Sequence, residues 1–228
     1  MAAPIPLSVD VVSDVVCPWC YIGKKRLETA LAAVPEVAAE VRWRPFQLDP
    51  TIPPGGIDRR EYMLGKFGSD ARISEIHARI RPLGAAEGIT FDFEAIRRAP
   101  NTLDAHRVIR WAGSSGPTVQ NALVERLFRL NFEEGADLGA AAVLSAAASQ
   151  AGMDSAVVEA LLPTDTDREA VRAEIETAQR MGVTGVPCFL LDGKYAVMGA
   201  QEPNVLADAL RQLAAQKGAT APAASDSR

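Results

Sequence analysis

VSDVVCPWCYIGKKRLE, residues 12–28, decides how the chain begins to fold. The preceding stretch, Ile5–Val12, alternates apolar and polar residues and leads into two more valines, which is typical of a strand that ends at the first cysteine. Pro18 suits a first helical turn, and an apolar face continues to a stop at Pro35. We therefore expect a strand that delivers Cys17 to the N-terminus of a helix.

The next 140 or so residues, about the length of a domain, are dominated by helical patterns. Val37–Leu48 regains strand character and completes a βαβ opening. Candidate helices cover residues 58–87, 101–113, 117–132, 138–151 and 165–181. Thr166 and Glu169 match a capping box at the start of the last one. The block from Asp49 to Gly182 is far too long for a loop, so we expect an inserted helical subdomain.

The C-terminal part returns to strand patterns. Pro187–Leu191 and Tyr195–Met198 read as two short strands joined by Asp192-Gly193, a pair favoured in tight hairpin turns. Pro203 opens a final amphipathic helix. Residues 218–228 are rich in Ala, Pro and polar side chains and are predicted to be a disordered tail.

Composition and charge exclude several classes of protein. The 228 residues are 48% hydrophobic and 23% charged, as in soluble globular domains. The formal net charge is -5 and there is no basic run, so we expect no nucleic-acid partner. There is no signal peptide and no apolar stretch of about 18 residues, so the chain is expected to be cytoplasmic and not to bind membranes.

The motif Cys17-Pro18-Trp19-Cys20 carries the chemistry. A helix N-terminus stabilises the thiolate form of a cysteine placed there, and the thiolate is the nucleophile in disulfide exchange. Cys20 follows one helical turn later, close enough to attack a mixed disulfide held on Cys17. We predict that Cys17 attacks and Cys20 resolves, and that Pro18 and Trp19 influence geometry and substrate contact without acting as acid or base.

A zinc site is the competing interpretation of such a pair. Tetrahedral zinc needs two further Cys or His ligands, and Cys188, His77 and His106 have no paired spacing. A metal site is therefore not favoured. Both histidines are most simply helix-surface or capping residues; His106 is the better outside candidate because it lies in the run described next.

Three stretches resemble the FrnE-type branch of the DsbA family: the residue 12–28 motif, residues 101–107 (NTLDAHR), and residues 184–187 (TGVP) with the following DGKYAVMGAQ. The resemblance implies an α/β, thioredoxin-like fold with a large all-α helical insertion. The thioredoxin-like domain would comprise residues 1–48 and 183–217, with helix 165–182 packed on it, and the insertion residues 49–164.

The resemblance also assigns a substrate-binding edge. It implies that the Val186-Pro187 bond is cis, that Pro187 packs against the active-site cysteines, and that Val186 offers backbone groups to an extended substrate. Pro18 and Trp19 complete this expected substrate site. The partner would be a protein or a small molecule that contains a thiol or a disulfide.

The chain departs from the thioredoxin pattern at two places. Thioredoxins carry a buried acid six residues before the first cysteine, where this chain has Val11. Asp10 or Asp14 could accept a proton from Cys20, but a solvated or turn-forming role is the favoured interpretation for both. Cys188 is interpreted as a small buried strand residue, with a third thiol near the active pair as the alternative.

Two other functions stay open. The same branch contains glutathione-dependent 2-hydroxychromene-2-carboxylate isomerases and kappa-class glutathione transferases, in which a serine commonly replaces the first cysteine. Because Cys17 and Cys20 are both present, redox chemistry is favoured, and no cofactor is predicted beyond glutathione as a candidate co-substrate. A non-enzymatic chaperone would leave the cysteine pair unexplained. The direction of electron flow is not decided by the motif.

Overall fold

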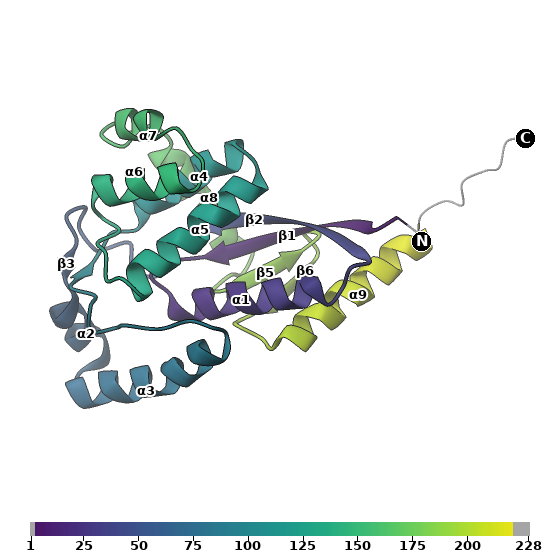
Figure 1. The fold of residues 1–228 in the computed structure, drawn as a ribbon, viewed down its shortest axis with the longest axis horizontal. Helices are drawn as coiled ribbons and strands as arrows, with labels where there is room; N and C mark the ends of the chain where they lie inside the picture. Colours follow the sequence, from purple (N-terminus) through teal and green to yellow (C-terminus); the bar gives the residue numbers. More distant parts are fainter. Residues whose placement is uncertain (1–2, 221–228) are drawn as a thin grey trace, which may run out of the picture.

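The computed structural model describes residues 3–220, and its centre is a four-stranded sheet with the order β2-β1-β5-β6. The strands are β1 (Ile5–Ser13), β2 (Val37–Pro45), β5 (Cys188–Leu191) and β6 (Tyr195–Met198). β1 runs parallel to β2 and antiparallel to β5, and β6 is antiparallel to β5. The first and last parts of the chain therefore share one sheet (Figure 1).

The helices form two groups around this sheet (Figure 1). Their bounds are α1 (Pro18–Ala32), α2 (Arg59–Phe67), α3 (Asp70–Ala86), α4 (Leu103–Ser114), α5 (Pro117–Phe132), α6 (Ala141–Gln150), α7 (Ser155–Leu161), α8 (Arg168–Arg180) and α9 (Pro203–Thr220). α1 and α9 pack on each other, whereas α4, α5 and α8 contact β2. α2 and α3 lie at the end of the sheet where α1 begins. The short strands β3 (Ile57–Asp58), before α2, and β4 (Arg98–Ala99), after α3, pair with each other in a second, two-stranded sheet.

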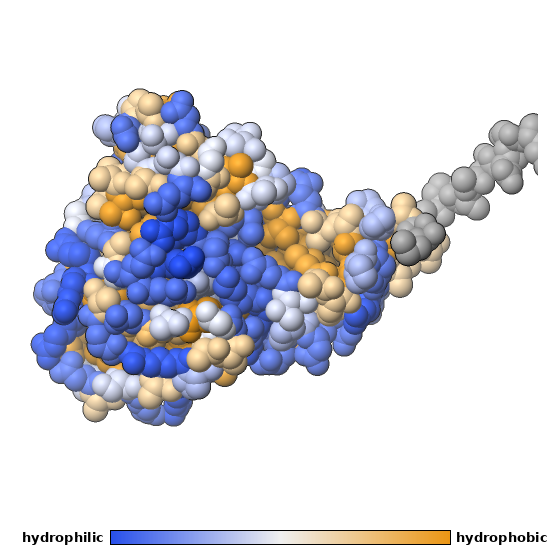
Figure 2. All heavy atoms as spheres, in the orientation of Figure 1, coloured by the Kyte–Doolittle hydropathy of each residue, from blue (hydrophilic) through white to orange (hydrophobic). Residues whose placement is uncertain are grey.

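The alternation in β1 separates two apolar clusters. Leu7, Val9 and Val11 are buried in the main core together with Cys17 and Cys20. Val12 points to the other face, where it belongs to a smaller cluster with Phe46. Hydrophilic residues cover most of the face of the helical part seen in Figure 2, as expected for a chain that buries its apolar side chains in these clusters.

The predicted order of elements is confirmed: βαβ, a helical block, a hairpin and a final helix. The hairpin turn is also as predicted. Asp192 and Gly193 have φ angles of 51° and 66°, and the Lys194 N–H donates to the Leu191 carbonyl at 3.0 Å. Positive φ at both central residues is what a type I′ turn requires, which explains the Asp-Gly pair.

Two predicted boundaries were wrong. β1 ends at Ser13 and does not extend through Val15 and Val16, because the chain turns and the Cys17 N–H donates to the Asp14 carbonyl at 3.0 Å. The single helix predicted over residues 58–87 is two helices, α2 and α3. Gly68 separates them with a φ of 88°, a conformation that only glycine adopts freely.

The predicted capping box of α8 was also wrong. Asp167, with a φ of 60°, is the N-cap residue, and no side chain caps the first turn. The backbone of Thr166, just before this N-cap, binds a side chain from another helix: its carbonyl accepts a hydrogen bond from Nε of the buried Arg107 at 2.7 Å. α7 was missed altogether, although Asp154 caps it by accepting from the Ala156 N–H at 2.9 Å.

α9 extends to Thr220, so the start of the predicted disordered tail, residues 218–220, is helical. Its last turns are tied to the sheet because Lys217 Nζ donates to the Pro6 carbonyl at 2.9 Å and pairs with Asp192 at 3.1 Å. The remaining tail, residues 221–228, lies outside the described residues. The division into a thioredoxin-like domain and an insertion stays a prediction.

Candidate functional site

The two cysteines occupy the first turn of α1. Cys17 is the N-cap residue, with extended backbone angles of -95° and 113°, and Pro18 follows at the first helical position. The Cys20 N–H donates to the Cys17 carbonyl at 3.0 Å, which places the second thiol one turn further into the helix. Both thiols are free. This is the predicted placement, and it directs the N–H groups at the start of α1 toward Cys17.

Exposure distinguishes the residues of the motif. Cys20 is fully buried and Cys17 is 4% exposed, whereas Trp19 is 40% exposed. The Cys17 thiol lies 3.7 Å from the Val186 carbonyl oxygen and donates to it. The Val186-Pro187 bond is cis, as expected. The structure therefore brings together Cys17 and the predicted substrate-binding edge.

A glycine allows this edge to approach α1 closely. A Cβ atom on Gly23 would lie 2.9 Å from Cγ of Pro187 and 3.2 Å from Cζ of Phe189. The proline ring and the first strand residues after it therefore rest directly on the helix that carries the cysteines. The position of the Val186 carbonyl depends on this contact.

The environment of Cys20 favours its neutral form. Burial, followed by the hydrogen bond and the charge of Cys17, raises the pKa of Cys20 well above its ordinary value. The backbone of Asp14 and the hydroxyl of Ser13 act in the opposite direction, because they stabilise the thiolate. Cys20 is thus a protonated thiol near neutral pH, which suits a resolving cysteine better than an attacking one.

The two acids near the motif lie in different surroundings. Asp10 does lie toward the surface, where its carboxylate pairs with Nε of Arg44 at 2.7 Å. Asp14, in contrast, is buried, and its Oδ2 accepts from the Leu48 N–H at 2.8 Å. Its Oδ1 lies 3.4 Å from Nε2 of His106. The solvated role predicted for Asp14 was wrong, but the turn-forming role is confirmed, because the Asp14 carbonyl accepts from the Cys17 N–H at 3.0 Å.

The histidines and the third cysteine are structural neighbours of the site. His106 is buried, so the surface or capping role predicted for it was wrong. His77 is half-buried and stacks on Phe93, with 4.1 Å between ring centroids.

Cys188 is fully buried in the second apolar cluster, beside Val12, and burial raises its pKa. The interpretation of Cys188 as a small buried strand residue is confirmed.

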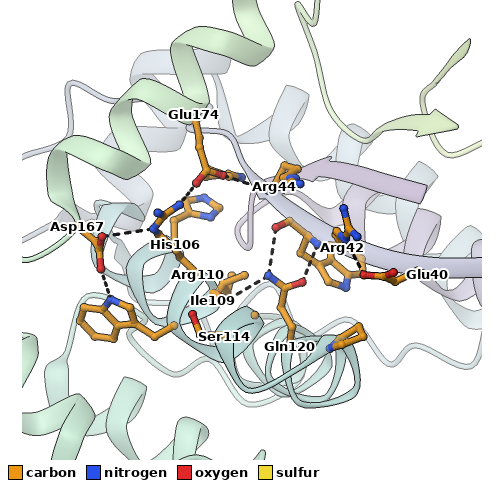
Figure 3. Close-up of a pocket in the computed structure, with 15 residues that line it drawn as sticks. Glu40, Arg42, Arg44, His106, Ile109, Arg110, Ser114, Gln120, Asp167 and Glu174 are labelled. Carbon is orange, nitrogen blue, oxygen red and sulfur yellow. Dashed lines mark hydrogen bonds and ion pairs between the residues drawn. The ribbon is translucent and has the colours of Figure 1, made fainter. Parts of the chain in front are cut away.

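Two cavities flank this region. One, of about 370 Å³, opens beside Cys17 and Trp19 and is walled by α2, α3 and the loops around them. Its apolar lining includes Ile52, Met63, Phe67, Ile76, Ile80 and Phe93. The other, of about 480 Å³, is polar and lies behind His106 (Figure 3). The apolar cavity is the one that reaches Cys17.

No metal-binding cluster of three or more His, Cys, Asp or Glu side chains occurs between residues 3 and 220. Over the same range, none of the helices combines the length and the apolar character needed to cross a bilayer.

A sheet of order β2-β1-β5-β6, with paired cysteines at the N-terminus of α1 and the Val186-Pro187 loop facing them, defines a thioredoxin-like protein with a helical insertion. A family model described as DSBA-like thioredoxin domain matches residues 8–211. The chain belongs to this family, which confirms the predicted α/β fold class.

Three known proteins are similar to this chain. The probable DsbA oxidoreductase SCO1869 of Streptomyces coelicolor is 33% identical and superimposes with a TM-score of 0.84, over 95% of this chain and 92% of that one. Uncharacterized protein YwbO of Bacillus subtilis is 26% identical, over 89% of this chain and 94% of its own length. A 2-hydroxychromene-2-carboxylate isomerase shares the fold, with a TM-score of 0.69 and 17% identity over 94% and 99% of the two chains.

Sequence reasoning missed two residues of the site. Ser13 contributes to the environment of Cys20, and its place at the end of β1 was a signal that could have indicated this. Arg59, the first residue of α2, lines the cavity beside Cys17. No local motif marks Arg59, because its place depends on how α2 packs over the start of α1.

Proposed function

We propose that the protein is a thiol-disulfide oxidoreductase or isomerase in which Cys17 is the nucleophile and Cys20 the resolving thiol. One observation carries the proposal: Cys17, at the N-terminus of α1, is only 4% exposed but lines the apolar cavity, whereas the fully buried Cys20, one turn later, does not line it. An attacking thiol needs access and anion-stabilising N–H groups, whereas a resolving thiol needs proximity alone.

The exchange proceeds in two balanced steps. The Cys17 thiolate attacks one sulfur of a substrate disulfide, forms a mixed disulfide and expels the other half of the substrate as a thiolate. Cys20 then loses its proton and attacks the Cys17 sulfur, which forms the Cys17–Cys20 disulfide and releases the second half as a thiol. Two electrons pass from the dithiol to the substrate, and the reverse sequence oxidises a dithiol.

The substrate edge supports a partner that contains a thiol or a disulfide, either a protein or a small molecule. Val186 places its carbonyl beside the Cys17 sulfur, and the exposed Trp19 ring offers an apolar contact next to it. A peptide that pairs with the backbone of Val186 would bind through its own backbone, so this contact would not require a particular substrate sequence. Cytoplasmic localisation stays a prediction.

A glutathione-dependent isomerase or transferase is the second candidate, because the apolar cavity beside Cys17 has the size of a small-molecule site. The two functions differ in their need for the second thiol. An isomerase or transferase would retain turnover in Cys20→Ser, whereas complete disulfide exchange requires Cys20.

The test is reductant-driven reduction of insulin disulfides by the purified protein. Cys17→Ser is expected to abolish turnover and Cys20→Ser to reduce it at least about tenfold, a change of roughly 1.4 kcal/mol in barrier height. Cys188→Ser is the matched control and should retain activity. Equal turnover in the wild type and Cys17→Ser would contradict the proposal.

A further inference from the structure

The cavity beside Cys17 contains an arginine that the exchange steps above do not use. Arg59 begins α2, where its backbone N–H donates to the Arg97 carbonyl at 3.0 Å and Asp58 is the N-cap. Its side chain lines the same cavity as Cys17 and Trp19. The charge of Arg59 is therefore available to a molecule that approaches the nucleophile.

The guanidinium group of Arg59 makes no ion pair within 4.0 Å in the part of the chain that the structure describes. Burial lowers the pKa of Arg59, and only Tyr62 acts against this shift. Arginine nevertheless keeps its charge in proteins. A partly desolvated guanidinium without a carboxylate partner is costly, and its planar fork matches a carboxylate in a bidentate arrangement.

The carboxylates that line this cavity are already engaged by other groups. Asp14 accepts from the Leu48 N–H at 2.8 Å, and Asp49 accepts from the Thr51 N–H at 3.0 Å. His77, which also lines the cavity, carries no negative charge that could pair with Arg59. Burial and, to a smaller extent, the charge of Arg59 lower the pKa of His77, so its side chain is neutral near pH 7. The cavity therefore presents apolar walls and two positive charges, those of Arg59 and Lys66, and within the described residues neither forms an ion pair with its carboxylates. Lys66 Nζ donates to the Tyr62 hydroxyl at 3.1 Å, whereas Arg59 lacks such a side-chain hydrogen bond in the described part of the chain.

The polar cavity behind His106 shows the opposite arrangement (Figure 3). There Arg110 pairs with Asp167 at 3.4 Å and with Glu174, which also lies 3.8 Å from Arg44. These arginines are neutralised by the protein itself. Arg59, which lines the same cavity as Cys17, is not neutralised in this way.

We propose that the substrate is a disulfide with at least one apolar half that bears a carboxylate, which occupies the cavity while its carboxylate pairs with Arg59. This inference rests on the proposed function and names its substrate class. The Cys17 thiolate attacks the sulfur of the bound half and the other half leaves as a thiolate. Cys20 then displaces the bound half from Cys17, as in the exchange above.

Two aromatic disulfides serve as probes for the reduced protein. Dithiobis(nitrobenzoate) carries a carboxylate on each ring, and dithiodipyridine is uncharged at neutral pH. Stopped-flow absorbance gives the second-order rate constant for Cys17 with each, in the wild type, in Arg59→Gln and in the control Arg60→Gln. Arg60 is the neighbouring arginine, but its side chain is 71% exposed and pairs with Asp70 at 2.7 Å.

Arg59→Gln is expected to slow the reaction with the nitrobenzoate disulfide about tenfold, because a charge-assisted hydrogen bond contributes roughly 1.5 kcal/mol or more. The rate with dithiodipyridine should stay within about twofold, which also shows that the variant is folded and its thiol accessible. Arg60→Gln should match the wild type with both probes.

The possible results of this experiment distinguish the carboxylate inference from the proposed thiol chemistry. Equal slowing of both disulfides in Arg59→Gln, or no slowing of either, would overturn the carboxylate inference and leave the thiol chemistry standing. Absence of reaction at Cys17 of the wild type with both probes would contradict the proposed function itself, and the inference with it. Partial retention of the nitrobenzoate rate in Arg59→Lys would support a charge effect.

Discussion

The thiol of Cys17 lies 3.7 Å from the carbonyl oxygen of Val186, although 169 positions separate the two residues in the sequence. The contact exists because β5 pairs with β1, so that the loop before β5 arrives beside the start of α1. The long helical insertion lies between these strands without separating them. The pairing of β1 with β5 thus brings Cys17 and the Val186 loop together.

Alkylation should separate the three cysteines. Iodoacetamide is expected to modify Cys17 first, because it lines an open cavity, whereas burial raises the pKa of Cys20 and Cys188. Peptide mass spectrometry of samples quenched over time near pH 7 measures the order. In Cys17→Ser the fast phase should vanish. Faster labelling of Cys20 than of Cys17 would reverse the assigned roles.

A variant without the resolving thiol should accumulate an intermediate. In Cys20→Ser, Cys17 can still attack a disulfide, but nothing in the first turn of α1 releases the product, so mixed disulfides with glutathione or protein should persist. Non-reducing electrophoresis and intact mass spectrometry detect them. Cys188→Ser should behave like the wild type. Adducts located on Cys188 in the Cys20→Ser variant would argue against Cys17 as the nucleophile.

The contact between α1 and the Pro187 loop should be sensitive to one methyl group. Gly23→Ala brings Cβ to 2.9 Å from Cγ of Pro187, so the loop or the helix must shift. We expect a loss of about 1–3 kcal/mol in the free energy of unfolding and slower exchange with disulfide substrates. Urea unfolding and the insulin assay measure the two effects.

Gly65→Ala is the matched control for this variant. Gly65 lies in α2, where an added Cβ meets nothing within 4 Å. Alanine is the better helix former, so this variant should be unchanged or stabilised by up to about 1 kcal/mol. If both variants lost the same stability and activity, the effect would not come from the Pro187 contact.

A charged contact should make α1 sensitive to acid. Lys24 and Lys25 lie 2.8 Å and 2.6 Å from the carboxylate of Glu125 on α5. Burial acts to raise the pKa of Glu125, but the hydrogen bonds from these lysines outweigh it and hold the pKa below its ordinary value of 4.5. Because the folded-state pKa is lowered, this stabilisation is present above about pH 4.5 and is lost as the pH falls through the folded-state pKa.

Glu125→Gln should therefore destabilise the protein by about 1–2 kcal/mol at pH 7, and by clearly less at pH 3. Denaturant unfolding at the two pH values gives the difference. Glu176→Gln is the control, since its pair with Arg180 is exposed and contributes little. A loss in Glu125→Gln that is the same at both pH values would rule out an ionised carboxylate as its cause.

The sequence alone was sufficient to predict those parts of the fold that depend on the conformational preferences of neighbouring residues. Cys17 and Pro18 define a strand-to-helix junction within a few residues, and Asp192-Gly193 defines a turn that needs two positive φ angles. These signals act through backbone preferences, which require no knowledge of distant residues. They explain why the active-site helix and the hairpin were predicted correctly.

Long-range packing explains what was missed. Asp14 and His106 are buried opposite each other only because the insertion folds back over the end of β1. Arg59 reaches the cavity because α2 covers the start of α1. Neither arrangement has a fixed spacing or period in the sequence. The capping box at Thr166 failed because α8 begins one residue later, after the N-cap Asp167, and the Thr166 hydroxyl accepts from the Thr164 hydroxyl at 2.8 Å.

In the proposed function, Cys17 and Cys20 form a reversible two-electron couple. The most direct measurement is equilibration of the protein in glutathione buffers of graded ratio, followed by acid quenching and mass spectrometry of the trapped species. We expect a single transition between the dithiol and a Cys17–Cys20 disulfide, with a tenfold change in the equilibrium ratio for every 30 mV or so, and with Cys188 reduced throughout. Persistence of both thiols in fully oxidising buffer, or a disulfide that includes Cys188, would contradict it.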